Sequence, residues 1–352
     1  MSAFNRICSA VLGLVLFLAG LLKLMDPVGA GLVADEYLRF FRLGFLRFAS
    51  PVLGSLMAYI ECAAGAALIT GVWRKITCIF SGALLGFFTL VTLVLLIFNP
   101  PMDCGCFGEA VHLSHVASFI KNLVLALIWL AAFAPFREFG LPQRSRYVSF
   151  GIALISSALF LLYSALTIPL VDFASFKPGT FLAGAVEEED GDSVEGEPLL
   201  SFYDARGDYA DSLALGGKVI IVSAYRGPDA RMERRTAAFL DAVSAEGFTP
   251  LFIASGTPAS LAEALSVPTL LSCTYSGDRR MLMTLNRSNG GATLVCDGQV
   301  VAKWPASRLP DAEKLSQIGT KDPVGVMHEV RNRDRVRLQG FLIYVLAVMF
   351  FI

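Results

Sequence analysis

Charged residues are scarce in this chain of 352 residues, where Asp, Glu, Lys and Arg together make up 17% of the sequence. Soluble globular proteins carry about 25% charged and about 45–50% apolar residues, whereas this chain is 55% apolar and has a mean hydropathy of +0.61. The shortage of charge excludes a disordered chain and an ordinary soluble enzyme. The net charge of −1 also argues against a nucleic-acid binder that relies on bulk positive charge.

Cysteine is also scarce. Seven cysteines spread over the whole chain are too few for the disulfide-stapled scaffolds of small secreted proteins. These two shortages leave a membrane protein, whose main partner is the lipid bilayer and which carries a soluble part.

Long apolar runs with few charges occur in the first half of the chain. A helix needs about 20 such residues to cross the hydrocarbon core. The sequence therefore predicts five membrane-spanning helices, at residues 7–25, 51–72, 76–98, 116–134 and 148–170. We expect the first helix to be retained rather than cleaved as a signal peptide, because it leads directly into Lys23 and Asp26 without a small-residue cleavage region.

The distribution of Lys and Arg predicts the orientation of these helices. With a cytoplasmic N-terminus, the inner loops hold more Lys and Arg than the outer loops, and the fifth helix ends outside. The expected location is a bacterial inner membrane, with the soluble domain in the periplasm. The arginines within residues 331–337 favour the opposite side unless they bind lipid headgroups on the outer surface. Residues 38–48 mix Arg with Phe and Leu, which predicts an amphipathic helix in the interface.

After the membrane part, an acidic stretch precedes an α/β pattern. We interpret residues 172–197, with the charge run at 187–192, as a solvated linker. Thr257 is an N-cap signal, and Asp297-Gly298 predicts a tight hairpin turn. The expected strands are residues 218–224, 249–254, 292–296 and 299–304, and the expected helices are residues 231–245 and 258–265. This order of elements is that of a thioredoxin-like fold.

The strongest chemical motif is Asp-Cys-Gly-Cys-Phe-Gly at residues 103–108, in the predicted outer loop before the fourth helix. Cys104 and Cys106 could exchange electrons as a labile disulfide at the membrane boundary. They could equally be idle or permanently bridged thiols. A third interpretation adds His112 and His115 to the two cysteines as a soft-metal site for zinc or copper(I).

Glu61 is the other unusual residue, because it lies near the middle of a predicted spanning helix. An ionisable group there is costly in lipid and normally faces the bundle interior. It could relay protons to a bound quinone, or it could only form a polar contact between helices. We expect the remaining cysteines to behave as small buried hydrophobes. Cys273 and Cys296 both lie near predicted strands of the soluble domain and could form a disulfide, but the sequence does not show the distance between them.

These residues resemble those of a known membrane family. Phe17, Ala19-Gly20, Lys23 and Asp26-Pro27, together with Glu61 and residues 104–108, are similar to the DoxX/MauE-like family. The longer architecture resembles DoxX-like proteins of Bacteroidetes that carry a fifth helix and a thioredoxin-like domain. That likeness rests on residues 166–173, 177–179 and 284–289, the hairpin, and Lys303-Trp304.

The resemblance implies a four-helix core similar to the vitamin K epoxide reductase bundle. It also implies a role in forming or keeping the disulfides of a partner protein, as in the maturation of methylamine dehydrogenase. The domains expected are the four-helix membrane domain at residues 1–136, the fifth helix at 137–171, the linker at 172–197, the thioredoxin-like domain at 198–320, and a basic segment with a short apolar tail at 321–352.

The soluble domain departs from a working thioredoxin in two places. Residues 225–228 read Tyr-Arg-Gly-Pro where a Cys-x-x-Cys motif is expected, and residues 289–291 read Asn-Gly-Gly where a cis-proline is expected. Without thiols that domain cannot perform dithiol exchange, so we interpret it as a binding or positioning domain.

Three functions therefore remain open. In the first, Cys104 and Cys106 cycle between dithiol and disulfide, pass electrons to a quinone near Glu61, and oxidise a periplasmic or membrane partner, which makes the chain a quinone-linked thiol–disulfide oxidoreductase. In the second, the chain is a non-catalytic scaffold or assembly factor that holds a partner through its thioredoxin-like domain. Metal binding by Cys104, Cys106, His112 and His115 is the third.

Overall fold

The computed structural model divides into two compact units. The first comprises Met1–Ala165 and Arg337–Ile352, and the second comprises Leu166–Val336. The structure describes residues 3–134, 144–183, 186–189, 192–195, 199–227 and 229–351.

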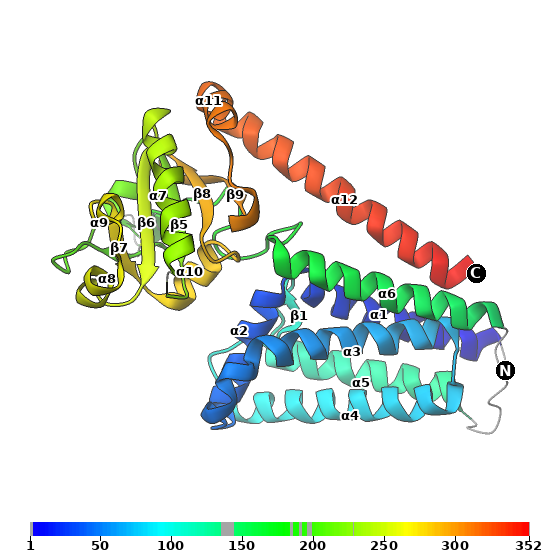
Figure 1. The fold of residues 1–352 in the computed structure, drawn as a ribbon. Coiled ribbons are helices and arrows are strands. Elements are labelled where there is room, and N and C mark those ends of the chain that lie inside the picture. The colour runs from blue at the N-terminus through cyan, green and yellow to red at the C-terminus, as the bar shows by residue number, and fades with distance from the viewer. Residues whose placement is uncertain are drawn as a thin grey trace. The chain divides into compact units, whose positions relative to one another are not determined.

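The first unit contains five helices that are long and apolar enough to cross a membrane, which confirms the prediction. They run side by side (Figure 1) as α1 (Ala3–Met25), α3 (Ser50–Thr70), α4 (Arg74–Phe98), α5 (His115–Phe133) and α6 (Arg144–Leu166). Ser114 caps α5 by accepting a hydrogen bond from the backbone N–H of Ala117. Helix α6 ends before the predicted residue 170, because the residue preceding Pro169 is disfavoured in the α conformation.

The predicted interfacial helix at residues 38–48 is wrong. The chain instead forms α2 (Pro27–Phe40) and a short 3-10 helix, η1 (Gly44–Ala49). Asp26 starts α2 by accepting a hydrogen bond from the backbone N–H of Gly29, and Pro27 occupies the first turn, where it has no N–H to leave unsatisfied. Arg42, with a φ of 57°, interrupts the helical path between the two elements.

Helices α1 and α3 pack closely because small residues face each other at their contact. A β-carbon added at Gly13 would lie 2.7 Å from the Gly65 carbonyl oxygen, and one added at Gly65 would lie 2.6 Å from the Gly13 carbonyl oxygen. Large apolar side chains elsewhere on the bundle are exposed in the protein alone, as is expected of lipid-facing positions.

The second unit is built on a six-stranded sheet in the order β4-β7-β6-β5-β8-β9. Strands β5, β6 and β7 are parallel, while β8 and β9 are antiparallel additions and β4 is antiparallel to β7. Their bounds are Phe202–Tyr203, Lys218–Ala224, Thr249–Ser255, Thr274–Gly277, Gly291–Cys296 and Gln299–Trp304 for β4 to β9 in chain order. The four predicted strands are confirmed. The sequence analysis missed β4 and β7, which are short.

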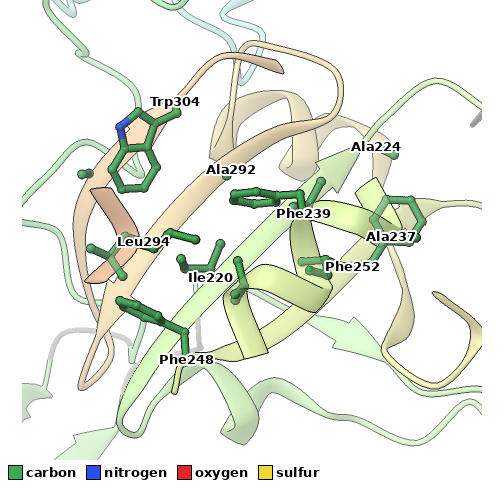
Figure 2. Close-up of a cluster of buried hydrophobic side chains, with 14 of the residues drawn as sticks. Ile220, Ala224, Ala237, Phe239, Phe248, Phe252, Ala292, Leu294 and Trp304 are labelled. Carbon is green, nitrogen blue, oxygen red and sulfur yellow. The ribbon is translucent and has the colours of Figure 1, made fainter. Parts of the chain in front are cut away.

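Helices cover the sheet and complete its core. They are α7 (Ala230–Ala245), α8 (Pro258–Ala264), α9 (Pro268–Leu271), α10 (Arg279–Leu285) and α11 (Ala312–Thr320). Figure 2 shows Ile220 and Phe252 from the sheet among Phe239 and Phe248, all buried. Thr257 caps α8 as predicted, and Asp297 and Gly298 both have positive φ, as a type I′ hairpin turn requires.

The ends of the second unit differ from the sequence expectations. Within the expected linker, Val186–Glu189 (β2) pairs antiparallel with Asp192–Glu195 (β3), while residues 190–191 of the charge run lie outside the described residues. Pro228 and the start of the expected fifth-helix domain at residue 137 lie outside them as well. The basic segment and apolar tail form one continuous helix, α12 (Pro323–Phe351), which is not among the helices apolar enough to span.

We expect Gly13→Ala to destabilise the membrane unit, because the added methyl group would meet the backbone of α3. Overpacking of this kind costs about 1–3 kcal/mol. Thermal unfolding of the protein in detergent micelles measures the effect. Gly86→Ala is the matched control, since nothing lies within 4 Å of a β-carbon at Gly86 of α4. A Gly13→Ala midpoint equal to that of Gly86→Ala would contradict the prediction.

Candidate functional site

The Cys-Gly-Cys loop forms a closed turn in the structure. Cys104 and Cys106 are joined by a disulfide, and the N–H of Gly108 donates to the carbonyl oxygen of Gly105 at 3.1 Å. Gly105 and Gly108 have φ values of 61° and 63°, which side chains with a β-carbon rarely adopt. The two glycines therefore make this turn possible. Cys104 is buried, with 6% exposure, and Cys106 is only half-buried.

Helix α2 holds this loop in place. The Tyr37 hydroxyl donates to the carbonyl oxygen of Cys104 at 2.7 Å, and a β-carbon at Gly105 would collide with Val33. Burial raises the pKa of Tyr37, with a smaller contribution from Glu36, so the phenol stays protonated and remains a donor at neutral pH. On the other side, a β-carbon at Gly108 would lie 3.6 Å from Cγ of Lys23. The loop thus fits between α1 and α2.

Glu61 forms an ion pair with Lys23 across the α1–α3 contact. The Lys23 Nζ atom lies 2.6 Å from Oε1 and 2.8 Å from Oε2 of Glu61, and the Glu61 side chain is 1% exposed. The two charges satisfy each other in surroundings where an isolated charge is costly. The expected polar contact between helices is therefore present, and its partner is Lys23.

A cavity of about 590 Å³ connects the loop with this ion pair. Its walls are mostly apolar side chains of α1 to α5. Its polar or reactive lining includes the disulfide, Tyr37, Lys23, Glu61, Thr92, Lys121 and Asn122. A mostly apolar enclosure with a few polar groups is typical of sites for small molecules. The structure thus places Cys104, Cys106 and Glu61 around a single space.

Polar groups of α4 and α5 complete the cavity wall. The Asn122 amide donates to Oγ1 of Thr92 and to the carbonyl oxygen of Phe88, both at 3.1 Å. The Nζ atom of Lys121 lies 4.9 Å from the centre of the Phe107 ring, over its face. Phe107 belongs to the same short loop as the disulfide, so Lys121 links α5 to that loop.

The structure does not gather the four residues of the metal interpretation. His112 lies 2.6 Å from an Asp103 carboxylate oxygen, and His115 lies within 3.0 Å of Asn99 and of the Met102 carbonyl oxygen. The cysteines are bonded to each other. Over the part of the chain that is described, no group of three or more His, Cys, Asp or Glu side chains could hold a metal ion.

The remaining cysteines are free thiols, and Cys273 and Cys296 are not paired. Burial raises the pKa of both of these thiols, which makes them poor nucleophiles near neutral pH. In the second unit, the residues that follow β5 contact the segment that precedes β8. The Tyr225 hydroxyl donates to the carbonyl oxygen of Arg287 at 2.8 Å, and the Arg226 N–H donates to Oδ1 of Asn289 at 2.9 Å.

Sequence reasoning missed three contributors to the site. Lys23 entered only as a residue at the end of the first helix and through the family resemblance, while Lys121 and Tyr37 received no role. The available signal was that two lysines and one glutamate occur within predicted spans, because charges there normally pair or line a cavity. No local pattern marks Tyr37.

The comparisons with known proteins find a match for the N-terminal part of the chain only. Residues 1–136 match the family model described as Methylamine utilisation protein MauE. The match includes α1 to α5 and the cysteine loop and supports a MauE-like membrane family for residues 1–136. No curated protein and no solved structure matches the chain.

The ion pair predicts an asymmetry between two single variants. Glu61→Gln leaves both Lys23 and Lys121 as positive charges at the cavity, whereas Lys23→Met leaves Glu61 with Lys121 still nearby. Removing one partner of a buried pair costs about 3–5 kcal/mol. We therefore expect Glu61→Gln to lower the free energy of unfolding by that amount and Lys23→Met to lower it by less. Unfolding in detergent measures both, with the exposed Lys75→Met as control. Equal losses, or a larger loss for Lys23→Met, would contradict this assignment.

Proposed function

We propose that the chain is a membrane thiol–disulfide protein that oxidises a partner through Cys104 and Cys106. The observation that carries the proposal is that the disulfide borders the same apolar cavity as the Lys23–Glu61 pair. A disulfide that served only to stabilise a loop would need neither a cavity behind it nor a buried charged pair beside that cavity.

The difference in exposure between the two cysteines supports different roles for them. A partner thiolate attacks the sulfur of half-buried Cys106, which breaks the disulfide and releases Cys104 as a thiolate. A second partner thiol then attacks the partner's own sulfur in the mixed disulfide and releases Cys106. The partner gains a disulfide, and two electrons and two protons remain on Cys104 and Cys106.

Reoxidation of the pair requires an acceptor of two electrons and two protons, and a membrane quinone is the class that fits an apolar cavity of about 590 Å³. A bound quinone would supply the electron sink. In this proposal buried Cys104 faces that sink, the apolar wall excludes water, and Glu61 receives and passes on a proton while Lys23 balances its charge.

The second unit provides the other candidate function, that of a scaffold for the partner. We propose a thioredoxin-like domain that binds rather than reacts. Its support is the junction of residues 225–227 with residues 287–289, which joins the two segments where a thioredoxin carries its thiols and its cis-proline. Here an arginine, an asparagine and a buried tyrosine take those positions. We further propose a bacterial inner-membrane location, with the disulfide loop and this domain on the periplasmic side.

Cys104→Ser and Cys106→Ser should each abolish disulfide formation, because either change removes one half of the exchanging pair. The measurement is the rate at which the purified protein, supplied with decylubiquinone, oxidises a reduced dithiol peptide. Cys78→Ser is the matched control, since Cys78 is a free thiol on α4 that does not line the cavity. Full activity in both single variants would refute the redox role and leave the scaffold.

Thiol trapping in intact cells tests the orientation. A membrane-impermeant maleimide should label Cys104 and Cys106 only after reduction, because the loop faces outward and its resting state is the disulfide. A variant that keeps these two cysteines alone makes the labelling specific. Labelling without reduction would contradict a resting disulfide, and absence of labelling even after reduction would contradict the outward loop.

A further inference from the structure

The charges of the cavity do not balance. Two lysines and one glutamate line it, and both carboxylate oxygens of Glu61 already accept hydrogen bonds from Lys23. Among the residues that the structure describes, Lys121 forms neither an ion pair nor a hydrogen bond, and its contact is the face of the Phe107 ring. One positive charge is therefore left facing an apolar space.

Such a charge is costly unless something compensates it. The ring of Phe107 attracts the ammonium group, but this contact uses one side of it and leaves its N–H donors available. The rest of the cavity wall is mostly apolar, with Leu85, Phe88 and Val91 of α4 and Leu125 of α5 among its residues. The site thus offers a hydrogen-bond donor with a positive charge at one place and a hydrophobic surface elsewhere.

We propose that this cavity binds an amphiphile whose head carries an electron-rich oxygen, and that Lys121 donates a hydrogen bond to that oxygen. The body of the ligand lies against the apolar side chains of α4 and α5. Lys121 is then the residue that selects the head, and the Lys23–Glu61 pair, being neutral as a whole, does not compete for it. A volume of about 590 Å³ is within the range of about 300–1,000 Å³ for such sites.

Two sources supply this chemistry in a membrane. One is the carbonyl oxygen of a quinone, and the other is the carboxylate of a fatty acid. The inference names the ligand class of the cavity on which the proposed function rests, but the binding itself requires no thiol turnover.

The experiment measures the binding of two probes, decylubiquinone and laurate, to the full-length protein in lipid nanodiscs by isothermal titration calorimetry. We expect wild type to bind at least one of them and Lys121→Met to bind it at least about tenfold more weakly, as for loss of a charged hydrogen bond. Lys121→Arg should keep most of the affinity. Lys75→Met, which alters an exposed lysine outside the cavity, should bind as wild type does.

Each outcome has a definite meaning. Loss of decylubiquinone binding in Lys121→Met identifies a quinone head, and loss of laurate binding identifies a carboxylate head. Binding of neither probe by wild type, or equal binding by wild type and Lys121→Met, overturns the inference. If Lys121→Met does not fold, Lys121→Gln replaces it, because its amide keeps a polar group but removes the charge.

Assaying the same wild-type preparation for peptide oxidation separates this inference from the proposed function. Probe binding is measured with the disulfide intact and without the dithiol peptide, so it requires no thiol turnover. Probe binding by a wild-type protein that forms no disulfides would leave the inference standing and refute the function. If wild type binds neither probe but oxidises the peptide with another electron acceptor, the proposed function stands and this inference is refuted.

Discussion

A single ion pair in the interior of the membrane unit determines how its first and third helices meet. Lys23 reaches Glu61 with both carboxylate oxygens in hydrogen-bond range, and a charge on either residue alone would be unfavourable in hydrocarbon. The pair can form only if α1 and α3 approach closely, and the facing glycines Gly13 and Gly65 allow that approach. The position of the cysteine loop follows, because Gly108 lies directly against Lys23.

The loop and the cavity are therefore products of the same packing. Helix α2 holds the loop from one side through Tyr37 and Val33, and α5 contacts it from another through Lys121 and Phe107. A disulfide, a charged pair and an apolar space are brought together by side chains from five helices and one short turn. This convergence, rather than the Cys-Gly-Cys spacing alone, is what favours redox chemistry over an idle bridge.

The sequence predicted those features that depend on neighbouring residues. Spanning helices follow from long apolar runs and the hairpin from Asp297-Gly298, whereas the predicted fifth span ran past Pro169 and α6 ends at Leu166. Helix α2 was not predicted, although its start signals, Asp26 and Pro27, are local. Short strands such as β7 depend on partners rather than on their own pattern.

The contacts between distant residues could not be predicted in the same way. Glu61 was recognised as unusual, but its partner is 38 positions away, and only the packing of α1 on α3 brings the two together. The Cys104–Cys106 disulfide closes a ring across a sequence separation of 2. Cross-links stabilise a fold more when they restrain a longer loop of chain, and this loop is minimal. Opening the bridge therefore removes little of what holds the helices together, so the redox cycle that we propose requires no change in the helical scaffold.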